Sequence, residues 1–184
     1  MNTVQAIKDK NDIALLLRFV EKHYSPVVFD VIKLGFNLPL RISDLLNLHK
    51  DNISNDCKYV EFKAAKTGKG DRYPLTEAAQ EVIQRRLAVS DTFLFLSDSN
   101  RSKASQKPIS RQYIGKVLQE VSTHLNLTIG THSFRKTWGY HYYTQTNNLA
   151  MVQRVLQHRS SAETLRYIGI EQQDIDQAIT SINF

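Results

Sequence analysis

Near its C-terminus the chain reads Leu156-Gln-His-Arg-Ser-Ser-Ala-Glu-Thr-Leu-Arg-Tyr-Ile168, and this segment says more about the architecture than any other. It carries His158 nine residues before Tyr167, between helical patterns at 149–156 and 162–168. A tyrosine in an amphipathic helix usually packs half-buried, and an isolated histidine is usually structural. The segment therefore acquires a functional meaning only together with polar groups earlier in the chain.

Two such groups precede it. Thr131-His-Ser-Phe-Arg-Lys136 places His132 and Arg135 three residues apart, on one face of an expected helix. Leu40-Arg-Ile-Ser-Asp-Leu45 places Arg41 at a helix start, with Asp44 three residues later. Each group alone is typical of a solvated or ion-paired surface. Their occurrence in one chain is what requires an explanation.

The rest of the chain is mostly helical in pattern. Apolar residues recur at helical spacing over 13–20 and 27–36, with Pro26 suited to a first helical turn and Pro39 ending the second helix. Between the two helical halves, 59–63 alternates with period two and 72–75 is its expected partner strand, across a turn-rich basic tip at 66–70. These patterns predict an α+β fold, mainly α-helical, with one small antiparallel β-sheet.

Capping residues define the later helices. Thr76 is expected to cap a helix over 77–87, Ser110 a helix that carries Ile114 and Val121, and Thr131 a helix over 132–145. A short apolar run at 93–96 precedes a polar, basic loop over 97–110, and a last helical piece is expected over 174–182. No internal repeat and no interdomain linker is visible.

Length and composition restrict the class of protein. A chain of 184 residues is the length of one domain, and 24 basic against 18 acidic residues give a net charge of +6 and a pI near 9.4, which favours an anionic partner such as nucleic acid. The single cysteine, Cys57, cannot form an internal disulfide, so a reducing compartment is expected. There is no run of 18 apolar residues and no signal-peptide pattern, so we expect a cytoplasmic protein with no membrane partner.

Taken together and in this order, the Arg-Ile-Ser-Asp, His-Ser-Phe-Arg and His-x8-Tyr elements resemble the tyrosine recombinase (phage integrase) family, and the Lys-Thr-Gly-Lys hairpin between the first two also matches. The resemblance covers residues 26–170, the catalytic domain of that family. It implies that residues 1–184 form a single catalytic domain without the N-terminal core-binding domain of typical members. The implied activity is site-specific DNA recombination through a 3′-phosphotyrosyl intermediate, which needs neither ATP nor a metal, so no cofactor is expected.

The resemblance also implies roles for individual residues. Tyr167 attacks the phosphodiester, and the guanidinium groups of Arg41 and Arg135 hold its non-bridging oxygens. By the same resemblance, His132 is a proton acceptor or a group that orients the phosphate, and His158 is a second hydrogen-bond donor. Lys66 on the hairpin is the implied general acid, and Asp44 is the carboxylate that orients an active-site cation. Lys63 and Lys69 are alternatives to Lys66 if the hairpin register differs, and Tyr140, Tyr142 and Tyr143 are expected to pack in the core or on the DNA surface.

Two positions depart from the family's pattern. Pro39-Leu40 stands where the family usually has Gly-Leu before the first arginine, and Gln157 stands where a glycine commonly precedes the late histidine. Neither departure removes a catalytic group, and either one can alter the rate.

Double-stranded DNA recombination sites are the expected partner. The basic residues expected to contact DNA lie on the hairpin, in the polar loop and around the catalytic groups: Lys63, Lys69, Arg72, Arg101, Lys103, Lys107, Arg111, Lys136, Arg154 and Arg159. Ile175, Ile179 and Ile182 form an apolar stripe in a tail at 171–184. This stripe either packs on its own core or docks into a neighbouring protomer. Docking would give a homo-oligomer, expected to be a tetramer, on synapsed DNA. The resemblance further implies a prokaryotic cell, with a phage or another mobile element as one origin of the gene.

Three other functions are compatible with parts of this pattern. A type IB topoisomerase uses the same residue types to relax DNA, and a DNA-binding regulator of the same family would need no catalysis. A phosphate-handling protein of unrelated fold would explain the arginines and histidines one by one. It would not explain their joint order.

Overall fold

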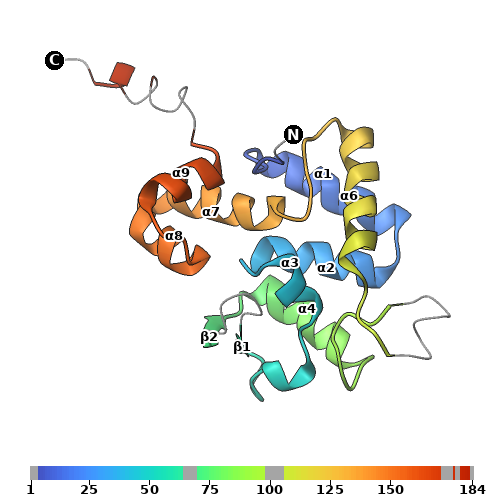
Figure 1. Cartoon of the computed structure of the whole chain (residues 1–184). Coiled ribbons are helices and arrows are strands. Elements are labelled where there is room, and N and C mark those ends of the chain that lie inside the picture. The colour runs from blue at the N-terminus through green and yellow to red at the C-terminus, as the bar shows by residue number, and fades with distance from the viewer. Residues whose placement is uncertain (1–3, 64–69, 98–105, 171–175, 177–178, 183–184) are drawn as a thin grey trace.

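The computed structural model describes residues 4–63, 70–97, 106–170, 176 and 179–182, which form a mainly helical fold with one small sheet (Figure 1). This confirms the predicted fold class. The elements, in chain order, are α1 (Lys10–His23), α2 (Pro26–Asn37), α3 (Ile42–Leu46), η1 (Lys50–Asn52), β1 (Tyr59–Lys63), β2 (Gly70–Pro74), α4 (Glu77–Leu87), α6 (Arg111–Leu125), α7 (Ser133–Thr146), α8 (Leu149–Leu156) and α9 (Ser161–Ile168).

Helix α2 is the centre of the larger core. It packs against α1, α3, α4 and α7, and its buried side chains include Val28, Val31 and Leu34. Pro26 occupies the first turn, where the missing amide hydrogen is not needed, and the helix ends at Asn37, before Pro39. Both helix ends agree with the sequence prediction.

A second, smaller core lies between helices α7, α8 and α9. Val152, Leu156 and Ile168 are fully buried where α7, α8 and α9 meet, on one side of the molecule in Figure 1. Gly139 in α7 allows this close approach, because a Cβ built there would lie 2.7 Å from Cγ2 of Ile168 and 3.3 Å from Cδ1 of Leu156.

The two cores meet where α7 crosses α2. The ring of Phe134 lies over Gly35, whose added Cβ would be 2.9 Å from the ring, and stands edge-on to Phe36 at 4.9 Å between ring centroids. Because Arg135 follows Phe134 and Arg41 follows α2 by a few residues, this contact sets the distance between the N-terminal ends of α7 and α3.

The sheet is a single antiparallel hairpin. Tyr59 pairs with Pro74, Glu61 with Arg72 and Lys63 with Gly70, so β2 begins two residues earlier than the pattern at 72–75 predicts. Val60 is buried and Tyr73 half-buried on the inner face. Arg72 and Glu61 lie on the outer face. Of the predicted tip at 66–70, residues 66–69 fall outside the described residues and Gly70 begins β2.

Most predicted caps are confirmed. The hydroxyl of Thr76 accepts a hydrogen bond from the amide of Ala79, and that of Ser110 accepts one from the amide of Tyr113. The cap at Thr131 is wrong by one residue, since the cap is His132. The reason is local: Ser133 donates its amide hydrogen to the Gly130 carbonyl, and its hydroxyl accepts from the Gly130 amide, which delays the helix.

The N-terminal segment packs on α7. The amide of Ile7 donates to the hydroxyl of Thr137, and the carbonyl of Ile7 lies 3.0 Å from Nε2 of His141. In the described part of the chain, no helix has the length and apolar character needed to cross a membrane.

The two-core packing predicts opposite effects for two glycine substitutions. We expect Gly139→Ala to lower the free energy of unfolding by about 1–3 kcal/mol, because the added methyl group would overlap Ile168. Gly115→Ala is the matched control in α6, where a Cβ meets nothing within 4 Å, and it should raise stability by about 0.5–1 kcal/mol. Urea unfolding measures both, and an unchanged stability for Gly139→Ala would contradict the close approach of α9 to α7.

Candidate active site

The turn between α8 and α9, residues 156–158, brings the predicted site residues together. The carbonyl oxygen of Leu156 accepts a hydrogen bond from Nη2 of Arg135 at 2.5 Å. The side-chain oxygen of Gln157 lies 3.5 Å from Nη1 of Arg41. The ring of His158 stands edge-on to that of Tyr167, with 4.7 Å between centroids. Three consecutive residues thus contact both arginines and the predicted nucleophile.

Local sequence explains the shape of this turn. Gln157 has the left-handed backbone conformation (φ 54°, ψ 40°) that ends α8, and Gln153 accepts the amide hydrogen of His158 at 3.0 Å. Helix α9 then begins at the hydroxyl of Ser160, which accepts from the amide of Glu163, and ends at Gly169 with φ +79°. The turn is therefore determined at both ends by short-range hydrogen bonds.

The two arginines are close enough to repel each other. Arg41 caps α3 and Arg135 lies in the first turn of α7, where it is only 6% exposed. Burial lowers the pKa of Arg135 and the charge of Arg41 lowers it further, whereas Tyr167, Tyr73 and Asp44 act in the opposite direction. The Nε atom of Arg135 has no hydrogen-bond partner among the described residues. This nitrogen is itself buried, so it does not face solvent.

Asp44 acts electrostatically on Arg135. It is 9% exposed, on α3 one turn after Arg41, and its negative charge is one of the groups that counteract the lowering of the Arg135 pKa. Its role in orienting an active-site cation stays a prediction.

Tyr167 lies in the same electrostatic field. Burial raises the pKa of its hydroxyl, while Arg135 and Arg41 act to lower it. Lys136 lies over its ring, with Nζ 5.2 Å from the centroid, and is itself only 9% exposed. Lys136, expected on the DNA surface, is thus found beside the tyrosine, and burial lowers its pKa.

The two histidines differ in their surroundings. The hydroxyl of Thr164 lies within hydrogen-bond distance of both the Ser160 carbonyl, at 3.0 Å, and Nδ1 of His158, at 3.2 Å, and it can donate its one hydrogen to either. When the hydroxyl donates to Nδ1, the neutral ring carries its hydrogen on Nε2, which is the tautomer that can donate to a phosphate oxygen. Desolvation lowers the pKa of His158, Glu163 acts to raise it, and Arg135 and Arg41 lower it further.

His132 is the more exposed histidine, at the N-terminus of α7. Desolvation lowers its pKa, and the positive charges of Arg111, Lys136 and Arg135 lower it further. Arg111 at the start of α6 is therefore an electrostatic neighbour of the site, although it is distant in sequence.

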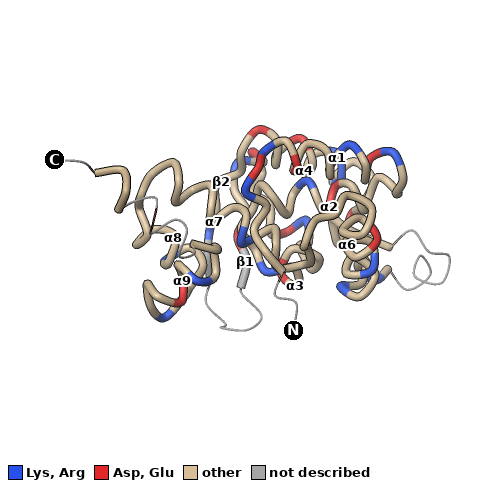
Figure 2. The backbone as a smooth tube through the Cα atoms, turned by 90° about the horizontal axis from the view of Figure 1, so that it is seen from above, with Lys and Arg blue, Asp and Glu red and all other residues tan. Residues whose placement is uncertain are grey.

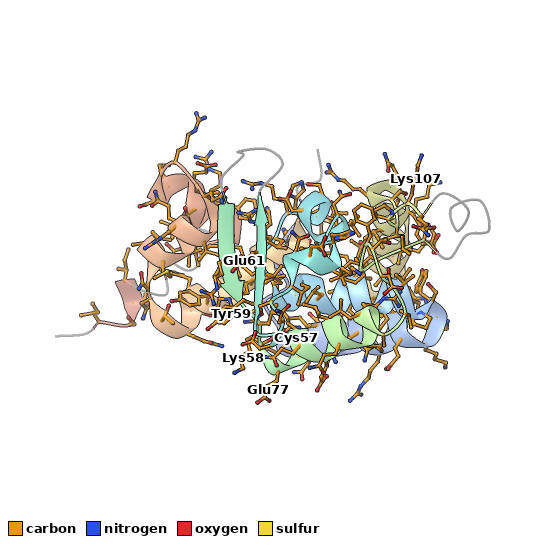
Figure 3. The ribbon with its side chains drawn as sticks, turned by 90° about the horizontal axis from the view of Figure 1, so that it is seen from below. Cys57, Lys58, Tyr59, Glu61, Glu77 and Lys107 are labelled. Atoms are coloured by element: carbon orange, nitrogen blue, oxygen red, sulfur yellow. The ribbon has the colours of Figure 1, made fainter. Side chains whose placement is uncertain are left out.

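The other predicted residues divide into three groups. Lys66, Lys69, Arg101 and Lys103 lie outside the described residues, and Lys63 is placed only as the last residue of β1. Lys107, Arg154 and Arg159 are exposed, with Lys107 at the far end of the molecule from Tyr59 and Glu61 in Figure 3. Arg72 is already engaged on the hairpin, 3.5 Å from Glu61 and 3.7 Å above the ring of Tyr59.

Two residues that shape the site, Tyr73 and Gln157, are not among those that the sequence motifs predict. The hydroxyl of Tyr73 donates to the Val155 carbonyl at 3.3 Å, which attaches the hairpin to the end of α8. In the sequence, Gln157 stands out only as a departure from the family's glycine before the late histidine. The alternation that turns Tyr73 inward beside Val60 was an available signal, whereas nothing in the sequence indicates the contact of Gln157 with Arg41. No cluster of three or more potential metal-ligating His, Cys, Asp or Glu side chains occurs among residues that the structure describes.

Comparison with known proteins gives one consistent result. The sequence model of the phage integrase family matches residues 9–174. The chain is 32% identical to the probable integrase/recombinase YoeC of Bacillus subtilis (strain 168) over 179 residues, which cover 94% of this chain and 93% of the relative. Solved structures similar in fold include the XerA recombinase, with a TM-score of 0.74 and 12% identity, over 98% of this chain and 66% of that one. The XerH site-specific recombinase bound to its palindromic difH substrate has a TM-score of 0.72 and 17% identity, over 97% of this chain and 54% of that one.

Proposed function

The chain belongs to the phage integrase family and is a site-specific recombinase of the tyrosine type, and from this premise we propose that Tyr167 is its nucleophile and that Arg41 and Arg135 hold the scissile phosphate. The observation that carries the proposal is the turn at 156–158. It links both guanidinium groups and the tyrosine through contacts of 2.5 Å, 3.5 Å and 4.7 Å.

The proposed reaction exchanges one phosphate ester for another. The Tyr167 oxygen attacks phosphorus, the bond from phosphorus to the 5′ oxygen breaks, and a 3′-phosphotyrosyl enzyme and a 5′-hydroxyl result. Attack by a second 5′-hydroxyl reverses the step and restores tyrosine. Because the ester is conserved in the covalent intermediate, no external energy source enters the balance.

Arg41 and Arg135 supply the electrostatic part of catalysis. The developing negative charge lies on the two non-bridging oxygens, and guanidinium groups already in place stabilise it without reorganisation. Burial of Arg135 strengthens this effect, since a charge pair is weakly screened there. Asp44, whose charge acts on Arg135, is proposed to keep these cations oriented.

Proton transfer needs an acceptor and a donor. The raised pKa of Tyr167 means that its hydroxyl keeps its proton in the DNA-free enzyme, so a base is required. We assign this role to His132, because its lowered pKa keeps the ring neutral at pH 7. His158 is proposed as the second phosphate ligand, and Lys66 stays the predicted general acid for the leaving 5′ oxygen.

DNA is proposed to lie over the face that carries these groups. Figure 2 shows Lys and Arg on both the α6 side and the α7–α9 side, interspersed with Asp and Glu. Arg111, Arg154 and Arg159 are exposed candidates for phosphate contacts. Arg72 would first have to leave Tyr59 and Glu61, so we expect it to contribute less than its charge suggests.

We also propose that the C-terminal tail docks on a neighbouring protomer, giving a tetramer on synapsed DNA. Ile179 and Ile182 are 68% and 64% exposed, so in this structure they do not pack on their own core. A cavity of about 670 Å³ lies at the base of the tail, lined by Ile7, Leu127, Ile129 and Ile170 together with Lys136 and Arg166. It offers an apolar surface to the isoleucines of a second copy.

Replacing the nucleophile should separate binding from cleavage. We expect Tyr167→Phe to bind DNA like the wild type and to form no covalent adduct, because the variant lacks only the attacking oxygen. The assay uses nicked suicide duplexes made from the repeats that flank the gene, in which cleaved strands cannot be rejoined. Tyr140→Phe is the matched control and should keep full adduct formation.

Two outcomes would contradict the proposal. An adduct that persists in Tyr167→Phe would exclude this tyrosine as the nucleophile. Tight, salt-sensitive binding by the wild type without any adduct would instead favour a DNA-binding regulator of the same family.

The pH dependence of cleavage should report the state of His132. At subsaturating DNA the rate reflects the free enzyme, and a lowered pKa means that the acid-side fall has its midpoint below 6.5, the ordinary histidine value. We expect His132→Gln to lose most of the cleavage rate and to show no acid-side decrease in what remains. His158→Gln should still show the acid-side decrease. A midpoint above 6.5 in the wild type would contradict a base that stays neutral through repulsion by Arg111, Lys136 and Arg135.

Substitution of the exposed isoleucines of the tail tests whether the tail docks on a neighbouring protomer. Ile179→Asp combined with Ile182→Asp should abolish complexes of four protomers on paired sites, measured by native mass spectrometry, and leave cleavage of a single site intact. Thr180→Asp adds a charge beside the stripe and should preserve the complexes. Four protomers per complex in the double variant would show that the tail is not the link.

A further inference from the structure

Gln157 occupies a backbone position that favours glycine. Its φ of 54° and ψ of 40° lie in the left-handed region, where a side chain clashes with its own carbonyl and glycine does not. The turn leaves no freedom to avoid this conformation. The Leu156 carbonyl before it receives Arg135, and the His158 amide after it donates to Gln153.

The side chain of Gln157 makes a specific contact in return. Its Oε1 lies 3.5 Å from Nη1 of Arg41, a residue 116 positions earlier in the sequence. Among the described residues, this amide oxygen is the hydrogen-bond acceptor found for the Arg41 side chain. A conformationally unfavourable residue is thus placed where its functional group meets one of the two phosphate-binding arginines.

We propose that Gln157 is a positioning residue, which holds the guanidinium of Arg41 beside Arg135 before DNA binds. The inference rests on the proposed function of the two arginines. Like charges would otherwise drive the more exposed Arg41 away from the buried Arg135, and the amide oxygen opposes that movement.

A neutral acceptor suits this role better than a carboxylate. A carboxylate at position 157 would form an ion pair with Arg41 and compete with the phosphate for the same hydrogen-bond donors. The amide oxygen carries only a partial charge, and its contact is long at 3.5 Å. The charged oxygens of a phosphodiester therefore replace it readily, and Arg41 is already in place when they do.

The substitution pair Gln157→Met and Gln157→Gly separates the amide oxygen from the backbone. Methionine has a similar length, keeps the unfavourable backbone conformation and lacks the acceptor, whereas glycine removes both. At subsaturating suicide duplex we expect both variants to slow single-turnover cleavage by about 5–10-fold, and at saturating duplex by less than about 2-fold, because the phosphate has replaced the amide oxygen once DNA is bound. Gln157→Gly should in addition melt at least about 2 °C higher than the wild type, because the backbone cost is gone.

The effect must pass through Arg41. In an Arg41→Ala background, Gln157→Met should change the residual cleavage rate by less than about 2-fold, as a double-mutant cycle requires when two residues act as one unit. A loss of the same size in both backgrounds, or cleavage that is unchanged or faster in Gln157→Met, would overturn the inference. A lower melting temperature for Gln157→Gly would assign the side chain to folding and would also overturn it.

A second readout needs no catalysis and keeps this inference separable from the proposed function. Nitrogen-15 NMR of arginine side chains in the DNA-free protein should show slow rotation about the Arg41 Nε–Cζ bond, and faster rotation in Gln157→Met. Arg41→Lys identifies the resonance. If the rotation is equally fast in both proteins, the positioning role is excluded, whereas the absence of a Tyr167-dependent adduct in the wild type contradicts the proposed function alone.

Discussion

Two guanidinium groups held side by side, one of them 6% exposed, form the constraint on which the rest of the site depends. Each group loses hydration, and each raises the electrostatic energy of the other. The chain meets this constraint with neutral acceptors and one carboxylate: the carbonyl of Leu156, the amide oxygen of Gln157 and the side chain of Asp44. These acceptors offset part of the cost of placing two cations close together.

The same turn that supplies these acceptors also determines where the tyrosine lies. Helix α9 starts three residues after His158 and is only eight residues long, so the position of Tyr167 follows from the position of the turn. Gly139 then lets Ile168 close onto α7, and Tyr167 of the same helix lies beside Lys136. The packing of the small core therefore determines the geometry of the site, because a shift of α9 by the width of a methyl group would displace Tyr167.

Short-range signals made much of the fold predictable. Pro26, Thr76 and Ser110 mark helix starts correctly, since each acts within its own first turn. The ordered motifs also predicted that Arg41, Arg135, His158 and Tyr167 would share a site. What the sequence could not indicate depends on distant contacts. The bond from Gln157 to Arg41 spans 116 residues, and the burial of Lys136 follows from how closely α9 approaches α7. The general acid, Lys66, stays a prediction from the motif.

The most direct test of this account is the chemical identity of the covalent link. The wild-type protein is trapped on a nicked suicide duplex and digested with nuclease and trypsin, and tandem mass spectrometry then locates the residual nucleotide. The account predicts a nucleotide 3′-phosphate on the hydroxyl of Tyr167. A nucleotide on Tyr140, Tyr142 or Tyr143, or on any serine, would contradict it, because the proposed mechanism gives the attack to Tyr167 alone.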